Sequence, residues 1–231
     1  MKIAIIQFGG SNCDMDVLHI FKDILNVNAE LVWYKNKDLS GYDGVVLPGG
    51  FSYGDYLRSG AIASRTPIMD SVKKIANEGK PVLGICNGFQ ILTEASLLDG
   101  ALMTNSYPKF ICDWTYLKVE NNNTIFTSRF NEGEVIKIPV AHKEGNYYNT
   151  PERLNELNNN HQVAFRYVNQ KGHLTNESNP NGSVENIAGI TNSKGNVLGL
   201  MPHPERAAES ILGSKDGLKL FLSMVDYFSN E

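Results

Sequence analysis

Four short apolar runs in the first half of the chain limit the possible folds more than any other feature. They are KIAIIQF (2–8), ELVWY (30–34), GVVLPGG (44–50), which ends in a glycine-rich loop, and PVLGI (81–85). Continuous apolar strands that alternate with helices are typical of a parallel sheet covered on both faces. We therefore expect an α/β fold with an open, mostly parallel sheet flanked by helices.

The segments between these runs have helical patterns. Residues 11–25 and 88–98 carry apolar side chains at helical spacing. The helix that follows Thr66 is the best delimited. Thr66 is a candidate N-cap, Pro67 suits the first helical position, and Gly79 suits the position just past the end.

The second half of the chain changes character. Strand-like runs with short connections occur at YLKVE (116–120), EVIKIPV (134–140), QVAFRYV (162–168), IAGIT (187–191) and NVLGLM (196–201). We expect these to add antiparallel strands, followed by a last helix over 214–228. The polar, Asn-rich stretch 145–160 is interpreted as a surface excursion. Since no repeat or linker is evident, residues 1–231 are predicted to form a single domain.

Composition excludes several classes of protein. The chain has 231 residues and a formal charge of −4, so no basic surface for nucleic acid is indicated. Its three cysteines include no CxxC pair, which argues against a disulfide framework or a zinc site. A reducing, cytoplasmic location fits this cysteine usage. We also expect no signal peptide and no membrane span, because no run of about 20 apolar residues occurs.

The stretch GICNGFQ places Cys86 between Gly84 and Gly88, where a strand ends and a helix begins. Small residues around such a turn let a nucleophile stand out from the sheet, and the helix start favours a thiolate. The amide of Asn87 is then a candidate oxyanion donor. A cysteine in an α/β core is often only a small hydrophobe, so the motif alone leaves both interpretations of Cys86 open. For Cys13 and Cys112, which lack this setting, the second interpretation is preferred.

A nucleophilic thiol needs a base, and LMPHPER (200–206) contains the strongest candidate. Pro204 favours an extended conformation at His203, so His203 and Glu205 point to the same side. Glu205 is then able to orient the imidazole of His203 toward a thiol. A surface turn with an incidental His and Glu is the alternative.

The loop LPGGFSYGD (47–55) follows a strand, and Gly49 and Gly50 permit a close approach of the backbone to a ligand. This arrangement suits a second oxyanion donor. A phosphate-binding loop is disfavoured, because neither G-x-x-x-x-G-K-[ST] nor G-x-G-x-x-G is present.

GICNGFQ together with MPHPE resembles the class I, or triad, glutamine amidotransferases. Five further stretches resemble the glutaminase subunits of phosphoribosylformylglycinamidine synthase, of the small, separate-subunit type: QFGGSNCD, LPGGFSYGDYLRSGAIA, PVAHKEGNYY, NPNGSVENIAGI and GNVLGLMPHPERA. The resemblance extends over nearly the whole chain. It implies the flavodoxin-like form of the α/β fold.

The resemblance also implies roles for particular residues. Cys86 would attack glutamine and form a γ-glutamyl thioester, with His203 as base and then acid and Glu205 as its orienter. The residues implied for substrate binding or the oxyanion are Gly49, Gly50, Phe51, Asn87 and Gln90. No metal and no cofactor are implied in this chain.

Partners follow from the same resemblance. A large synthetase subunit would bind ATP, Mg²⁺ and formylglycinamide ribonucleotide, and a small third subunit would bridge the two proteins. The loop containing Arg58 and the segment AHKEGNYY are expected docking or gating surfaces. Two departures occur, since FGGSNCD stands for FPGSNCD and AHKEG for AHGEG. They place Gly9 and Lys143 at those positions, and neither touches the predicted triad.

Three other functions are weighed. Another triad amidotransferase subunit would deliver ammonia to a different acceptor. A cysteine hydrolase or peptidase of similar architecture is disfavoured, because those families generally lack a late His-x-Glu segment. A non-catalytic assembly subunit is disfavoured by the complete set of Cys86, His203 and Glu205.

Overall fold

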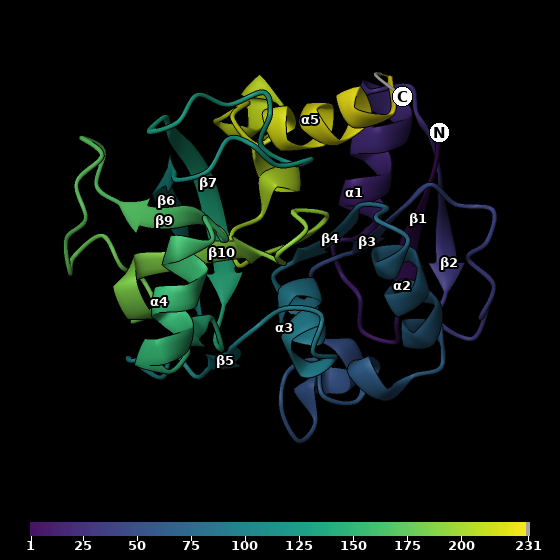
Figure 1. Ribbon diagram of the computed structural model, residues 1–231, viewed down its shortest axis with the longest axis horizontal. Helices are drawn as coiled ribbons and strands as arrows, with labels where there is room; N and C mark the ends of the chain where they lie inside the picture. Colours follow the sequence, from purple (N-terminus) through teal and green to yellow (C-terminus); the bar gives the residue numbers. More distant parts are fainter. Residues whose placement is uncertain (230–231) are drawn as a thin grey trace.

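The computed structural model describes residues 1–229, and its centre is a nine-stranded sheet (Figure 1). The order of the strands is β2-β1-β3-β4-β11-β10-β9-β6-β7. Their bounds are β1 (Lys2–Gln7), β2 (Asn28–Trp33), β3 (Gly44–Leu47), β4 (Val82–Ile85), β6 (Ile111–Val119), β7 (Val135–His142), β9 (Val163–Val168), β10 (Ile187–Thr191) and β11 (Val197–Leu200). β5 (Ala101–Met103) and β8 (Asn146–Tyr148) form a separate antiparallel pair.

The sheet has a parallel half and an antiparallel half. β2, β1, β3, β4 and β11 pair in parallel, whereas β11, β10, β9, β6 and β7 pair antiparallel. Because β11 takes the fifth place, the parallel half has the 2-1-3-4-5 order of doubly wound folds. The predicted α/β fold, with antiparallel strands added by the second half of the chain, is confirmed.

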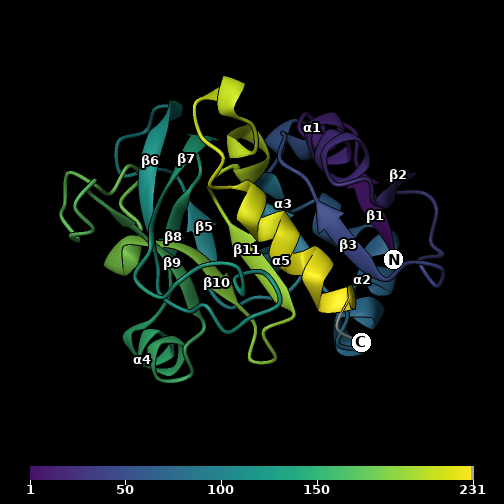
Figure 2. The ribbon, with the colours of Figure 1, turned by 90° about the horizontal axis from the view of Figure 1, so that it is seen from above.

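Helices cover both faces of the parallel half. Their bounds are α1 (Asp14–His19), α2 (Ile68–Asn77), α3 (Asn87–Glu94) and α5 (Leu218–Ser229), whereas α4 (Pro151–Asn159) lies beside the antiparallel half. α1 and α5 lie on one face, and α2 and α3 lie on the other (Figure 1). The ring of Phe21, in the π-helix that follows α1, meets the ring of Phe221 on α5 edge to face at 5.5 Å. Seen from above, α5 crosses the middle of the sheet, between its parallel and antiparallel halves (Figure 2).

Two predicted helix starts are wrong. The first helix begins at Asp14 and not at residue 11, because the amides of Asn12 and Cys13 both donate to the carbonyl of Gly49. Its final part, Ile20–Ile24, is a π-helix. Thr66 does not cap α2, since its hydroxyl donates to the carbonyl of Ala63 at 2.7 Å.

The predicted end of α2 is confirmed by Gly79, which has a left-handed φ of 84°. α3 and α5 have their predicted positions, although α3 ends earlier, at Glu94, and α5 begins later, at Leu218.

The Asn-rich stretch 145–160 is more ordered than expected. It contains β8 and α4, and the hydroxyl of Thr150 accepts a hydrogen bond from the amide of Arg153 at α4's first turn. Leu154 and Leu157 bury one face of α4. The polar composition of the stretch gave no sign of this narrow apolar face, so the helix was not predicted. Over residues 1–229, no helix has the length and apolar character needed to cross a membrane.

Candidate active site

Cys86 occupies the tight turn between β4 and α3. Its backbone has φ 50° and ψ −103°, a conformation that residues with a side chain rarely adopt. Its amide donates to the carbonyl of Leu200 at 2.8 Å, which ties the turn to β11. The sharp strand-to-helix turn predicted from the sequence is therefore present, and strain of this kind is typical of functional positions.

The two glycines near Cys86 are required by space. A Cβ atom at Gly88 would lie 2.0 Å from the carbonyl oxygen of Leu47 on β3. One at Gly84 would lie 2.5 Å from Leu92 and 2.7 Å from the backbone of Gly88. The first turn of α3 can thus press against β3 and β4 only because these side chains are absent.

His203 reaches the site because β11 lies beside β4. The two strands are parallel, with Leu200 opposite Ile85, so the segments after them leave the same sheet edge. Nδ1 of His203 lies 2.6 Å from Oε1 of Glu205, and both side chains are buried. The shared orientation of His203 and Glu205 predicted from the sequence is confirmed.

The charges around His203 favour its protonated form. Burial opposes the positive charge, but the carboxylate of Glu205, the nearby sulfur of Cys86 and the contact with the thiol of Cys13 raise the pKa of His203 well above its usual value. Nε2 of His203 is buried and has no hydrogen-bond partner within residues 1–229. Nδ1 is held by Glu205, so Nε2 is the nitrogen left to exchange a proton with Cys86 or a substrate.

The glycine-rich loop after β3 lies against the same centre. A Cβ at Gly49 would come within 2.7 Å of the His203 ring. Gly50 and Ser11 form an antiparallel bridge. The hydrogen bonds on either side of it run from the amide of Asn12 to the carbonyl of Gly49 and from the amide of Phe51 to the carbonyl of Gly10, the latter at 2.9 Å. The amide of Gly50 therefore points away from Ser11.

Asn87 and Gln90 are buried and hydrogen-bonded to each other in the first turn of α3, which follows Cys86. The amide of Asn87 lies in the first turn of α3, where backbone donors lack helical acceptors. Its side chain accepts from the amide of Ser52 and donates to Oε1 of Gln90 at 2.8 Å. Nε2 of Gln90 donates to the carbonyl of Glu144 at 2.6 Å. Gln90 thus lies at the site, with both ends of its amide already bonded.

Cys13 lies beside His203, although the sequence predicted only a small hydrophobic residue there. Its thiol is buried, lies 3.9 Å from Nδ1 of His203 and accepts a hydrogen bond from Nη2 of Arg206 at 3.1 Å. Burial raises the pKa of the Cys13 thiol. The signal available was its place in QFGGSNCD, one of the stretches that carried the family resemblance.

Cys13 also belongs to a group of possible metal ligands. The ligand atoms of Cys13, His203 and Glu205 lie within 4.8 Å of one another. Sequence spacing does not reveal this group, because 190 residues separate Cys13 from His203. The guanidinium of Arg206 donates a hydrogen bond to the Cys13 thiol, and its positive charge repels a metal cation. These three residues therefore do not favour a metal ion.

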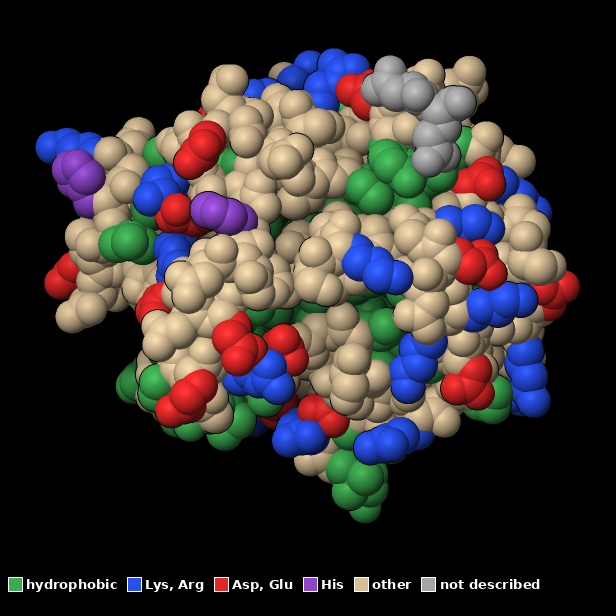
Figure 3. All heavy atoms as spheres, in the orientation of Figure 1, with side chains coloured by type: hydrophobic (Ala, Val, Ile, Leu, Met, Phe, Trp, Pro, Cys, Tyr) green, Lys and Arg blue, Asp and Glu red, His purple; other side chains and the backbone are tan. Residues whose placement is uncertain are grey.

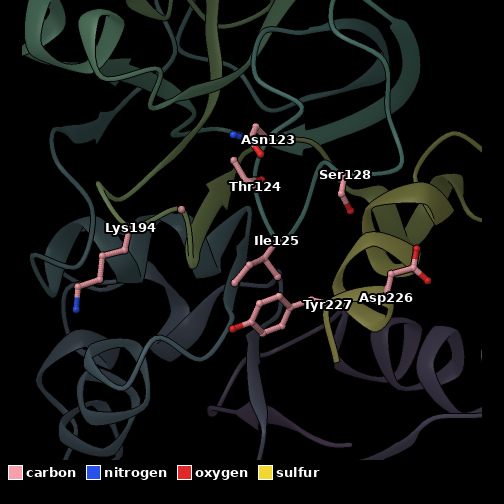
Figure 4. A pocket seen from close by; sticks show the side chains of 8 residues that line it. Asn123, Thr124, Ile125, Ser128, Lys194, Asp226 and Tyr227 are labelled. Carbon is pink, nitrogen blue, oxygen red and sulfur yellow. The ribbon is translucent and has the colours of Figure 1, made fainter. Parts of the chain in front are cut away.

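A hollow lies elsewhere, between the segment 123–128, the turn at Gly195 and α5 (Figure 4). It has a volume of about 440 Å³, and its lining includes Thr124, Lys194 and Asp226. None of the predicted site residues contributes to its walls. Because the centre at Cys86 is closely packed, the size of a hollow is a poor guide to the site in this molecule.

The chain matches a known protein family over nearly its whole length. A family model of the CobB/CobQ-like glutamine amidotransferase domain matches residues 1–228. The "Phosphoribosylformylglycinamidine synthase subunit PurQ" of Methanosarcina mazei is 71% identical over 229 residues, covering 99% of each chain. The subunit of the same name from Aquifex aeolicus is 53% identical, covering 97% of this chain and 99% of its own.

Solved structures agree with this grouping. A chain in the structure of PurLQS from Thermotoga maritima has a TM-score of 0.87 and 46% identity, covering 98% of both chains. A glutamine amidotransferase from the same organism, with 18% identity, a TM-score of 0.56 and coverage of 100% of this chain and 83% of its own, shows the fold alone. The chain belongs to the glutamine amidotransferase family and, within it, groups with the PurQ subunits of phosphoribosylformylglycinamidine synthase.

Proposed function

We propose that this chain is the glutaminase subunit of a phosphoribosylformylglycinamidine synthase, with Cys86, His203 and Glu205 as its catalytic triad. The observation that carries the proposal is the buried pair of His203 and Glu205 beside a cysteine in a strained strand-to-helix turn. The names of relatives that match almost the whole chain support the same activity.

The chemistry divides amide hydrolysis into two steps. The Cys86 thiolate adds to the side-chain carbonyl carbon of glutamine, and the oxyanion is held by the amides of Gly50 and Asn87. The C–N bond breaks as His203 gives its proton to the leaving nitrogen, which departs as ammonia. Water, deprotonated by His203, then cleaves the γ-glutamyl thioester, releasing glutamate and restoring the Cys86 thiol.

A glutaminase of this type requires partners. Ammonia released into neutral water becomes mostly ammonium, which is not nucleophilic. We therefore propose delivery through a shielded route to a synthetase subunit, which converts formylglycinamide ribonucleotide to formylglycinamidine ribonucleotide in purine biosynthesis. ATP and Mg²⁺ act on that synthetase, a small subunit bridges the two proteins, and the assembly works in the cytoplasm. The PurLQS structure from Thermotoga maritima, in which the similar chain occurs, supports a three-part assembly.

The synthetase docks, in this proposal, on an apolar rim beside the site. The rim comprises Phe51, Tyr56, Leu57, Tyr107 and Phe110. Tyr56 is 72% and Leu57 83% exposed, and the rings of Phe51 and Phe110 lie 6.1 Å apart. Figure 3 shows hydrophobic side chains projecting at the lower edge, where Figure 1 draws the loop after β3. Exposed large apolar side chains that lie near one another, as Phe51 and Phe110 do, are typical of protein contacts.

The first experiment measures glutamate release by the wild type and Cys86→Ala, alone and with the synthetase and bridging subunits. Cys112→Ala, at an exposed cysteine, is the matched control. We expect activity in the wild type and control only, and ammonia transfer to formylglycinamide ribonucleotide in the full assembly. Equal hydrolysis by Cys86→Ala would refute the assignment of the nucleophile. Transfer to a different acceptor would instead indicate another amidotransferase system.

A further inference from the structure

His142 is a buried histidine that takes no part in the triad. It ends β7 and is 2% exposed. Nδ1 of its ring lies 3.2 Å from Oδ1 of Asn105, and Nε2 lies 3.3 Å from Nδ2 of Asn181. Both nitrogens of the ring are thus bonded to side-chain amides from distant parts of the chain.

The directions of these two bonds follow from the backbone groups around them. Oδ1 of Asn105 accepts from the amide of Gly145 at 3.0 Å, so it is an acceptor and Nδ1 of His142 must carry a proton. Oδ1 of Asn181 accepts from the amide of Ser183 at 3.1 Å, which leaves the NH₂ group of Asn181 facing Nε2. Nε2 is therefore an acceptor and the imidazole is neutral.

The surroundings reinforce this state. Burial, and to a lesser extent the positive charge of His203, lower the pKa of His142 to about 4. The side-chain amide of Asn181 also donates to the hydroxyl of Tyr167, on strand β9, which β6 separates from β7. A second proton on His142 would place the Nε2–H donor against the NH₂ donor of Asn181 in a buried, water-free site, which is energetically costly.

The segment that this ring holds contacts the catalytic elements directly. The thiol of Cys86 lies 3.6 Å from the carbonyl oxygen of Ala141, and Gln90 donates to the carbonyl of Glu144. A Cβ at Gly145 would come within 2.4 Å of the His142 ring, so the backbone turns tightly over it. His142 lies at the centre of this turn.

We propose that His142, held as the neutral Nδ1–H tautomer between Asn105 and Asn181, is a positioning residue for the glutaminase reaction. By fixing the turn Ala141–Gly145, it sets where the carbonyl of Ala141 meets the Cys86 thiol and where that of Glu144 holds Gln90. This inference rests on the proposed function. It adds to the triad a second histidine that must remain uncharged while His203 gains and loses a proton.

The proton positions are tested on the intact chain by nitrogen NMR of ¹⁵N-labelled histidine, with signals assigned by single replacements. We expect His142 to show the Nδ1–H tautomer and to stay neutral between pH 6 and 8. A signal for the Nε2–H tautomer, or for a charged ring at neutral pH, would overturn the proposal. This readout does not depend on glutaminase activity, so it is separate from failure of the proposed function.

Kinetics in the full assembly test the role. His142→Phe keeps a ring over Gly145 but loses both bonds, and His173→Phe, at an exposed loop histidine, is the matched control. We expect kcat to fall about tenfold or more, with KM for glutamine changed by less than about threefold, because positioning acts mainly on the reacting geometry. Activity equal to that of the control would refute a positioning role.

Conservative replacements separate hydrogen bonding from packing. His142→Asn retains a donor toward Asn105, and His142→Gln retains an acceptor toward Asn181. Each is expected to recover part of the kcat lost in His142→Phe. If both fold and neither exceeds His142→Phe, the proposed hydrogen-bond role of His142 is wrong.

Discussion

At the scale of single residues, the site contains two histidines with opposite protonation. His203 faces Glu205 and Cys86, which raise its pKa, whereas His142 faces two neutral amides in a dry setting that lowers its pKa to about 4. One imidazole is thereby suited to exchange a proton, and the other is suited to hold a fixed set of hydrogen bonds. Their different environments separate the two roles.

Replacement of Glu205 tests the first of these roles. Glu205→Gln should lower kcat by about 10²–10⁴-fold, because the imidazole loses its orienter and the charge that supports its protonated form. The stability that His203 gains from its partners is fully present below pH 6.5, its ordinary pKa, and is lost as pH rises through the raised folded value. Urea unfolding across this range should show that loss in the wild type and not in Glu205→Gln. An unchanged pH dependence would contradict the assignment.

His142 predicts a pH dependence of the opposite sign. The unfolded chain takes up a proton below about pH 6.5, whereas the folded chain does so only near 4. The free energy of unfolding should therefore fall as pH drops from about 6.5 to 4, by roughly 3 kcal/mol from this group. Urea unfolding at pH 7.5 and 5 should show a smaller drop in His142→Phe than in His173→Phe. Equal drops would count against a neutral buried imidazole.

At the scale of secondary-structure elements, the turn between β4 and α3 depends on close backbone contact. The carbonyl of Leu47 occupies the space where a side chain at residue 88 would lie. The same packing brings the first turn of α3, with the amide of Asn87, to the sheet edge where β3 and β11 also end. The packing of Gly88 against Leu47 therefore also sets where the amide of Asn87 lies.

Gly88→Ala should lower both the stability of the fold and the glutaminase activity. We expect destabilisation of about 1–3 kcal/mol, typical of overpacking, and loss of most glutaminase activity, because the helix must shift away from Leu47. Gly41→Ala is the matched control, since a Cβ there has no neighbour within 4 Å. Thermal unfolding and glutamate release measure the two effects. Wild-type behaviour of Gly88→Ala would mean that the turn is less tightly constrained than the contacts indicate.

At the scale of the whole molecule, the catalytic centre is closely packed, whereas the rim beside it is apolar and exposed. Leu57 contributes little to the folded chain, because 83% of its surface is accessible. Lys143, one of the two departures from the family pattern, is exposed on the turn next to His142 and has no left-handed φ, so its side chain fits without strain. The exposure of the rim supports the proposal that it binds an external partner.

Leu57→Ser should therefore weaken assembly with the synthetase while leaving thermal stability unchanged. Ile211→Ser, at a residue that is 91% exposed between β11 and α5, is the matched control. Arg58→Glu, which reverses the charge of a residue paired with Glu94, should also reduce coupled synthesis. Sedimentation of the mixed subunits and ammonia transfer measure these effects. Wild-type assembly and transfer in both Leu57→Ser and Arg58→Glu would refute the proposed docking surface.

The sequence by itself determined what depends on local backbone rules. Glycines around Cys86 predicted the strained turn, prolines around His203 predicted an extended segment shared with Glu205, and apolar runs predicted the parallel half of the sheet. Tertiary structure alone decided which distant residues meet. Cys13 lies beside His203, and His142 bonds Asn105 and Asn181, through strand order and loop packing that no local pattern encodes. The physical reason is that local sterics act between neighbours in sequence, whereas buried hydrogen bonds are selected only after the sheet has assembled.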